Sequence, residues 1–156
     1  IEKLTWMSDT TKEKALKKLD TMQINVGYPE DVQSYMDDVE IKSAADGGSY
    51  FENMLAISKE QAKNLIEHQD EPIDKNDWGM AVYTVNAMYD SLANSITFPA
   101  GILQAPIYDV KASYEENLGG IGYIIAHEIT HAFDNNGAKF DENGNATDWW
   151  TEEEGC

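Results

Sequence analysis

The sequence predicts an α+β fold in which helices outweigh strands, and three observations support this class. Apolar residues recur at helical spacing in three segments, at residues 8–22, 49–68 and 114–136. Two neighbouring segments rich in β-branched and aromatic residues are separated by turn residues, which predicts an antiparallel hairpin. Hydrophobic residues make up 42% of the 156-residue chain, which is enough for a packed core.

The first helix is expected to begin near residue 8, with Ser8 or Asp9 as its N-cap. A short strand is expected at residues 23–29, where "QINVGYP" alternates briefly before glycine and proline stop it. A longer helix is expected from Ser49 to His68. Its apolar positions are Phe51, Met54, Leu55, Leu65 and Ile66.

After a polar surface loop, the predicted hairpin occupies residues 82–98. "DSLANS" supplies its turn, and "SITF" is its second strand. The first strand is favoured by Val82, Tyr83, Val85 and Tyr89. The helix expected at 114–136 contains glycines that predict close packing against a neighbour, at positions 119, 120 and 122. Its stop signals are Asn135, Asn136 and Gly137.

Composition excludes several classes of function and partner. The formal charge is −18, so phosphate backbones would be repelled and a nucleic-acid partner is not expected. Cys156 is the only cysteine, which excludes an internal disulfide and a cysteine-based zinc site. No apolar run approaches the length of a membrane span. Both ends look cut, which suggests a fragment of a longer protein.

The chemical signal lies in "AHEITH", where His127, Glu128 and His131 form the pattern H-E-x-x-H. Residues four apart lie on the same face of a helix, so both imidazoles can reach one Zn²⁺ ion. Glu128 projects at a different angle and is better placed to accept a proton from a water at the metal. The pattern is the signature of zinc metalloproteases, and it is weighed against two ordinary histidines packed in a helix.

Other residues near this motif are less decisive. The metzincin extension is excluded because Asp134 and Gly137 stand where it requires glycine and histidine. Asp134 could support a ligand histidine, and a solvated or capping aspartate is an equal alternative. His68 is expected to be an exposed histidine at a helix end, and Trp149 and Trp150 to be core or interface aromatics.

Several longer segments resemble the neprilysin family of zinc endopeptidases, peptidase family M13, which includes bacterial oligopeptidase O. They are "VNAMYDSLANSITFPAGILQAPIYD", "NLGGIGYIIAHEITHAFDNNGAKFDENGN", "DWW" and, near the N-terminus, "WMSDTTKEKALKKLDTMQINVGYP". The resemblance implies a zincin-like (thermolysin-like) fold with a small antiparallel sheet beside the H-E-x-x-H helix. It also implies a helical segment at 1–70 that precedes a partial catalytic domain at 71–156.

The resemblance implies that His127 and His131 are zinc ligands and that Glu128 is the catalytic base. It further implies that Asn86 and Ala87 bind substrate on an edge strand, whereas Asn86 by itself would be read as a polar strand end. The family's third ligand is a glutamate in an E-x-x-x-D pattern, which does not occur in this sequence. The single zinc of the complete domain is therefore expected to take its third ligand from outside this chain.

The expected function is that of a zinc metalloendopeptidase acting on oligopeptides, with peptides as partners. The alternatives are a truncated, catalytically inactive fragment and a module that only binds peptides. Truncation is expected to expose apolar surface that allows self-association. A bacterial cytoplasmic or exported enzyme is favoured over an animal membrane ectoenzyme, because cysteines are nearly absent.

Overall fold

The computed structural model describes residues 1–30, 36–37, 39–151 and 154. These form two compact units, one of residues 1–29 and 73–156 and one of residues 30–72. The units divide the chain differently from the predicted segments 1–70 and 71–156, because the N-terminal residues pack into the larger unit. The assignment of residues 71–156 to a partial catalytic domain, preceded by a helical segment at 1–70, stays a prediction.

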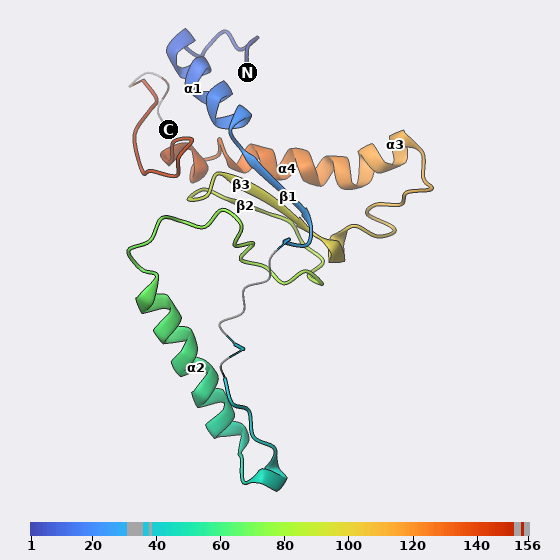
Figure 1. Ribbon diagram of the computed structural model, residues 1–156. Coiled ribbons are helices and arrows are strands. Elements are labelled where there is room, and N and C mark those ends of the chain that lie inside the picture. Colours follow the sequence, from blue (N-terminus) through green and yellow to red (C-terminus); the bar gives the residue numbers. More distant parts are fainter. Residues whose placement is uncertain (31–35, 38, 152–153, 155–156) are drawn as a thin grey trace. The chain divides into compact units, whose positions relative to one another are not determined.

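The larger unit is built on a three-stranded sheet with the order β1-β3-β2 (Figure 1). β1 (Gln23–Gly27) pairs with β3 (Ser95–Pro99) in parallel, and β2 (Met88–Asp90) pairs with β3 in antiparallel fashion. The sheet is therefore mixed, and the prediction of an antiparallel sheet was wrong. It was wrong because β1 joins from a segment about 70 residues earlier, and no local pattern signals that pairing.

The hairpin is shorter than predicted. The antiparallel pair β2–β3 is confirmed, but residues 82–85 form a turn at 82–83 followed by irregular backbone and a bend, instead of a strand. The N–H of Gly101 donates to the carbonyl of Val82, and a Cβ added at Gly101 would clash with the backbone of Tyr83 and Thr84. This close approach bends residues 82–85 around Gly101 and keeps them out of the sheet.

Helix α1 (Asp9–Asp20) begins at the N-cap Ser8, whose hydroxyl accepts a hydrogen bond from the N–H of Thr11. The long central helix contains α3 (Tyr114–Asn117), a π-helical turn η3 (Leu118–Gly122) and α4 (Tyr123–His131). A Cβ at Gly120 would clash with the carbonyl of Ile107, which confirms the predicted close packing there. Gly119 has open space instead.

The central helix packs on the sheet through an apolar core (Figure 1). Ile121 is buried in this core, and Ile124 and Ile129 pack against it from the same helix. The strand β3 and the segments before β2 and after β3 contribute Ala87, Ile96, Phe98 and Ile102. A second core joins Met7 and Ala15 to Trp149, so Trp149 finds its packing partners within this chain.

The smaller unit contains α2 (Tyr50–Glu67), a short 3-10 turn at Ala44–Asp46 and an extended segment. Ser49 and Glu52 form a capping box at the start of α2, which confirms the predicted helix start. The side-chain amide of Asn53 exchanges hydrogen bonds with the backbone of Lys42, which ties the extended segment to the helix. No residue of α2 is buried. Among the described residues, no helix combines the length and hydropathy that crossing a membrane requires.

Candidate active site

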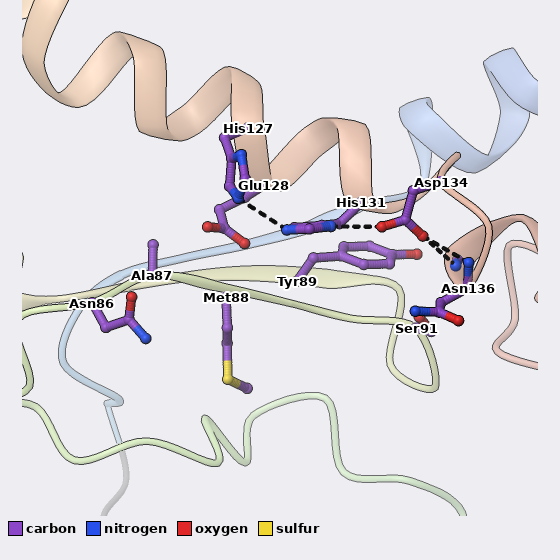
Figure 2. A pocket seen from close by; sticks show the side chains of 11 residues that line it. Asn86, Ala87, Met88, Tyr89, Ser91, His127, Glu128, His131, Asp134 and Asn136 are labelled. Carbon is purple, nitrogen blue, oxygen red and sulfur yellow. Dashed lines mark hydrogen bonds and ion pairs between the residues drawn. The ribbon is translucent and has the colours of Figure 1, made fainter.

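The two motif histidines lie one turn apart on α4, His127 at its middle and His131 at its end, where the helix passes over the sheet (Figure 2). Their Nε2 atoms are 3.0 Å apart, and the rings meet edge to face with centroids separated by 4.5 Å. His127 is exposed, and 41% of the His131 side chain is accessible. The sequence spacing thus brings two imidazole nitrogens to one accessible point, as predicted for the motif.

Asp134 holds the second of these histidines (Figure 2). Its Oδ2 lies 2.7 Å from Nδ1 of His131, and its Oδ1 accepts the backbone N–H groups of Asn136 and Gly137 at 2.8 and 2.9 Å. The hydrogen bond with His131, followed by that from Gly137, lowers the pKa of Asp134 to about 2. A carboxylate here accepts a hydrogen bond from the N–H at Nδ1, and in that tautomer the Nε2 lone pair is free for a ligand.

Glu128 is buried on the underside of α4, with only 6% of its surface exposed. Its carboxylate points toward the strand that carries Ala87 and Met88 (Figure 2). None of the described residues donates a hydrogen bond to this carboxylate. A carboxylate in such a position is available to accept a proton from a molecule bound in the pocket.

Asn86 and Ala87 lie just before β2, at the rim of the same pocket. Ala87 is buried in the core beneath α4, and Asn86 is exposed. Their side chains point to opposite sides of the strand, so that of Asn86 points away from the histidines (Figure 2). The alternation puts the Asn86 side chain on the opposite side of the segment from Ala87, and the segment leads into β2, an edge strand of the sheet.

The pocket is open and has a volume of about 410 Å³. Besides the predicted residues it is lined by Met88, Tyr89, Ser91, Asn136 and Gly137. The sequence analysis did not identify these residues as part of the site. Met88 could have been identified, because it is two residues from Asn86 in an extended segment and so lies on the same side of it. The hydroxyl of Tyr89 donates to Oδ1 of Asn94, and burial raises the pKa of Tyr89.

A metal ion fits the histidine pair with little adjustment. Two nitrogens at about 2.0–2.1 Å from a tetrahedral zinc ion stand roughly 3.3 Å apart, close to the observed 3.0 Å. Asp134 already favours the required tautomer of His131. Within the described ranges, however, no group of three metal-ligating side chains comes together. The described residues therefore offer two candidate ligands, His127 and His131, and a carboxylate that contacts one of them.

Known proteins are similar to this chain in sequence and in fold. Two models described as peptidase family M13 match residues 1–29 and 86–155. A neutral endopeptidase of Lactobacillus helveticus is 44% identical over 96% of this chain, and mouse neprilysin is 38% identical over 98% of it. The chain spans 23% and 21% of these relatives' lengths, respectively.

Solved structures agree with this match. PEPO from Lactobacillus rhamnosis HN001 superposes with a TM-score of 0.80 at 46% identity, over 96% of this chain and 23% of that one. A zinc metalloprotease of Mycobacterium tuberculosis, solved with an inhibitor, gives a TM-score of 0.87 at 38% identity, over 98% of this chain and 22% of that one. Two models of one family together match most of the chain, and the relatives and solved structures match nearly all of it. The chain therefore belongs to peptidase family M13.

Proposed function

We propose that this chain is part of a zinc metalloendopeptidase that cleaves oligopeptides, in which His127 and His131 bind the metal and Glu128 is the general base. The observation that carries the proposal is the convergence of two Nε2 atoms 3.0 Å apart with a buried carboxylate in one pocket beside a strand edge. Relatives named neutral endopeptidase and zinc metalloproteinase support this reading.

The chemistry assigns one step to each group. His127 and His131 would hold a zinc ion, which would supply Lewis acidity to the scissile carbonyl and to the attacking water. As the water oxygen attacks the carbonyl carbon, Glu128 takes the proton that the water loses. When the C–N bond breaks, Glu128 returns this proton to the leaving amine nitrogen. Asp134 keeps Nδ1 of His131 protonated, so that Nε2 stays available as a ligand.

Substrate binding is proposed at the strand edge. An extended peptide can lie along the segment that contains Asn86 and Ala87, with backbone hydrogen bonds giving affinity. The Asn86 amide can both donate to and accept from the peptide backbone. This arrangement, an edge strand beside the metal-binding helix, is the zincin-like (thermolysin-like) feature that we propose for the complete domain.

The third zinc ligand is proposed to lie outside this chain, because the described residues offer only two ligands together. Residues 1–156 produced alone are accordingly expected to hold zinc weakly and to lack peptidase activity. Metal analysis after dialysis, together with a fluorogenic peptide assay, measures both properties. Stoichiometric zinc and chelator-sensitive cleavage by this chain alone would contradict a third ligand outside it.

The function itself is tested in the intact protein with the substitution Glu128→Gln. The amide cannot accept the proton of the attacking water, so kcat/KM for a peptide should fall by about 10²–10⁴-fold with zinc content unchanged. Glu67→Gln, at an exposed position of α2, is the matched control and should leave turnover unaltered. Near wild-type cleavage by the Glu128→Gln variant would refute the mechanism.

A bacterial cytoplasmic or exported location remains our proposal and is tested by fractionation.

A further inference from the structure

Lys18 is a buried cation on α1, far in sequence from the active-site motif. Only 1% of its surface is exposed, and its Nζ donates to the carbonyls of Ala132, Gly137 and Phe140 at 2.8, 2.7 and 2.7 Å. An ammonium has three hydrogens, so all its donors are used. All three acceptors belong to residues 132–140, the turn after α4, which includes a 3-10 turn at Gly137–Lys139.

Two of these carbonyls accept a second hydrogen bond, that of Gly137 from the N–H of Phe140 and that of Phe140 from the indole N–H of Trp149, so the contact of Lys18 with Ala132 matters most at the helix end. The last carbonyls of a helix have no N–H donor within the helix, and Ala132 is the C-cap residue of α4. A cation at this end also interacts favourably with the helix dipole. The rings of Tyr89, Phe133 and Trp149 surround the ammonium, with centroids 5.8–5.9 Å away. Lys18 thus acts as the C-terminal cap of the helix that carries the histidines.

The same turn carries Asp134. Asp134 accepts the N–H groups of Asn136 and Gly137 through Oδ1 and meets His131 through Oδ2. Lys18 holds the carbonyls on both sides of this short segment, at Ala132 and Gly137. Moving the turn would therefore move the Asp134 carboxylate relative to Nδ1 of His131.

Lys18 is itself fixed from the other side. The side-chain amide of the fully buried Asn94 donates to the carbonyl of Lys18 at 3.0 Å and to that of Glu142 at 3.4 Å. Figure 1 shows the end of α1 beside the end of α4. Burial is the largest influence on Lys18 and lowers its pKa to about 8, so the ammonium form still prevails at neutral pH.

We propose that Lys18 is a positioning residue for the metal site: by holding the turn after α4, it keeps the Asp134 carboxylate on His131 and so sets the zinc affinity. The inference rests on the zinc site proposed above and adds that the segment 1–29 takes part in building that site. It assigns Lys18 no contact with substrate or metal.

The test measures zinc affinity of the intact protein by competition with a chelator of known affinity. Lys18→Met keeps the aliphatic stem and removes all three donors, and zinc affinity should fall roughly 10–100-fold, as for other groups that orient metal ligands. Lys14→Met, the same substitution at an exposed position of α1, is the control and should leave the affinity unchanged. Wild-type affinity in the folded Lys18→Met variant overturns the proposal.

A double-mutant cycle separates positioning from general stabilisation. If Lys18 acts through Asp134, Lys18→Met should cost little further zinc affinity in an Asp134→Asn background, where the link to His131 is already weakened. Additive losses would show an effect that does not pass through Asp134 and would overturn the proposal. If the wild-type protein binds zinc and the Lys18→Met variant binds it equally well, only this inference is wrong. If the wild-type protein does not bind zinc, the proposed function is wrong as well.

Lys18→Gln provides a second variant in case Lys18→Met does not fold, as judged by circular dichroism. Its shorter amide has two donors and cannot satisfy three carbonyls, so the zinc affinity should still fall. Unchanged affinity in this variant overturns the proposal. Loss of folded structure in both variants also contradicts it, because Lys18 would then act on the whole fold and not on the turn.

Discussion

Two helices of this chain, α2 and α4, have similar sequence signals but opposite surroundings. Both were predicted from apolar residues at helical spacing, and both form. The apolar side chains predicted for α2 remain exposed, with Phe51 at 71% and Leu65 at 73%, whereas the helix ending in α4 buries Ile121 and Glu128. Hydrophobic periodicity in the sequence therefore indicates that a helix has an apolar face. It does not indicate which segment, if any, covers that face.

The same contrast applies to the histidines. His68 caps the end of α2, where Nδ1 lies 2.8 Å from the carbonyl of Asn64, and it is exposed as predicted. His131 lies at the end of α4, and its two ring nitrogens face Asp134 and His127. A histidine at a helix end is thus a solvated residue in one region and a candidate ligand in the other.

The largest effect should come from replacing one histidine in each region with alanine. In the intact protein, His127→Ala should abolish tight zinc binding and reduce peptide cleavage by more than about 10³-fold, because one remaining imidazole cannot hold the ion. His68→Ala is the matched control and should change neither quantity. Metal analysis and a fluorogenic peptide assay measure both. Zinc loss in the His68→Ala variant would show that the comparison assigns the ligands wrongly.

The next effect concerns packing of the same residue type in the two regions. Ile96→Ala, at a position with 2% exposure, should lower the free energy of unfolding by about 2–5 kcal/mol. Ile66→Ala on α2, at 63% exposure, should change it by less than about 0.5 kcal/mol. Denaturant unfolding of the intact protein measures both. A large loss at Ile66 would reveal a further segment that covers α2.

A smaller effect is expected at the strand edge. Asn86→Ala should reduce kcat/KM by a factor equivalent to about 1–3 kcal/mol, because a hydrogen bond to the bound peptide is lost. Zinc content should be unchanged, since Asn86 points away from the histidines. Asn64→Ala on α2 is the control. If both variants turn over peptide at the wild-type rate, Asn86 has no role in binding substrate.

The smallest effect distinguishes two neighbouring glycines of the central helix. Gly120→Ala should destabilise the protein by about 1–3 kcal/mol, because the new Cβ would clash with the carbonyl of Ile107. Gly119→Ala meets open space and should be neutral or stabilising by up to about 1 kcal/mol. Thermal unfolding of the two variants is the measurement. Equal melting temperatures would contradict the close packing inferred at Gly120.

Local sequence determined the elements and the chemistry of the motif. Ser8 and Ser49 start their helices because a hydroxyl that accepts a backbone N–H is a local interaction. The four-residue spacing of His127 and His131 fixes their common face for the same reason. Family resemblance then supplied the proposed substrate-binding roles of Asn86 and Ala87, which their residue types alone did not predict.

Tertiary structure decided everything that joins distant segments. Only the fold shows that β1 pairs in parallel with β3, that residues 82–85 turn around Gly101, and that Lys18 reaches the turn after α4. These contacts depend on backbone carbonyls and on packing partners more than 15 residues away, and neither has a signature in the local sequence. The sequence therefore determined which residues could do chemistry, and the fold determined which residues hold them in place.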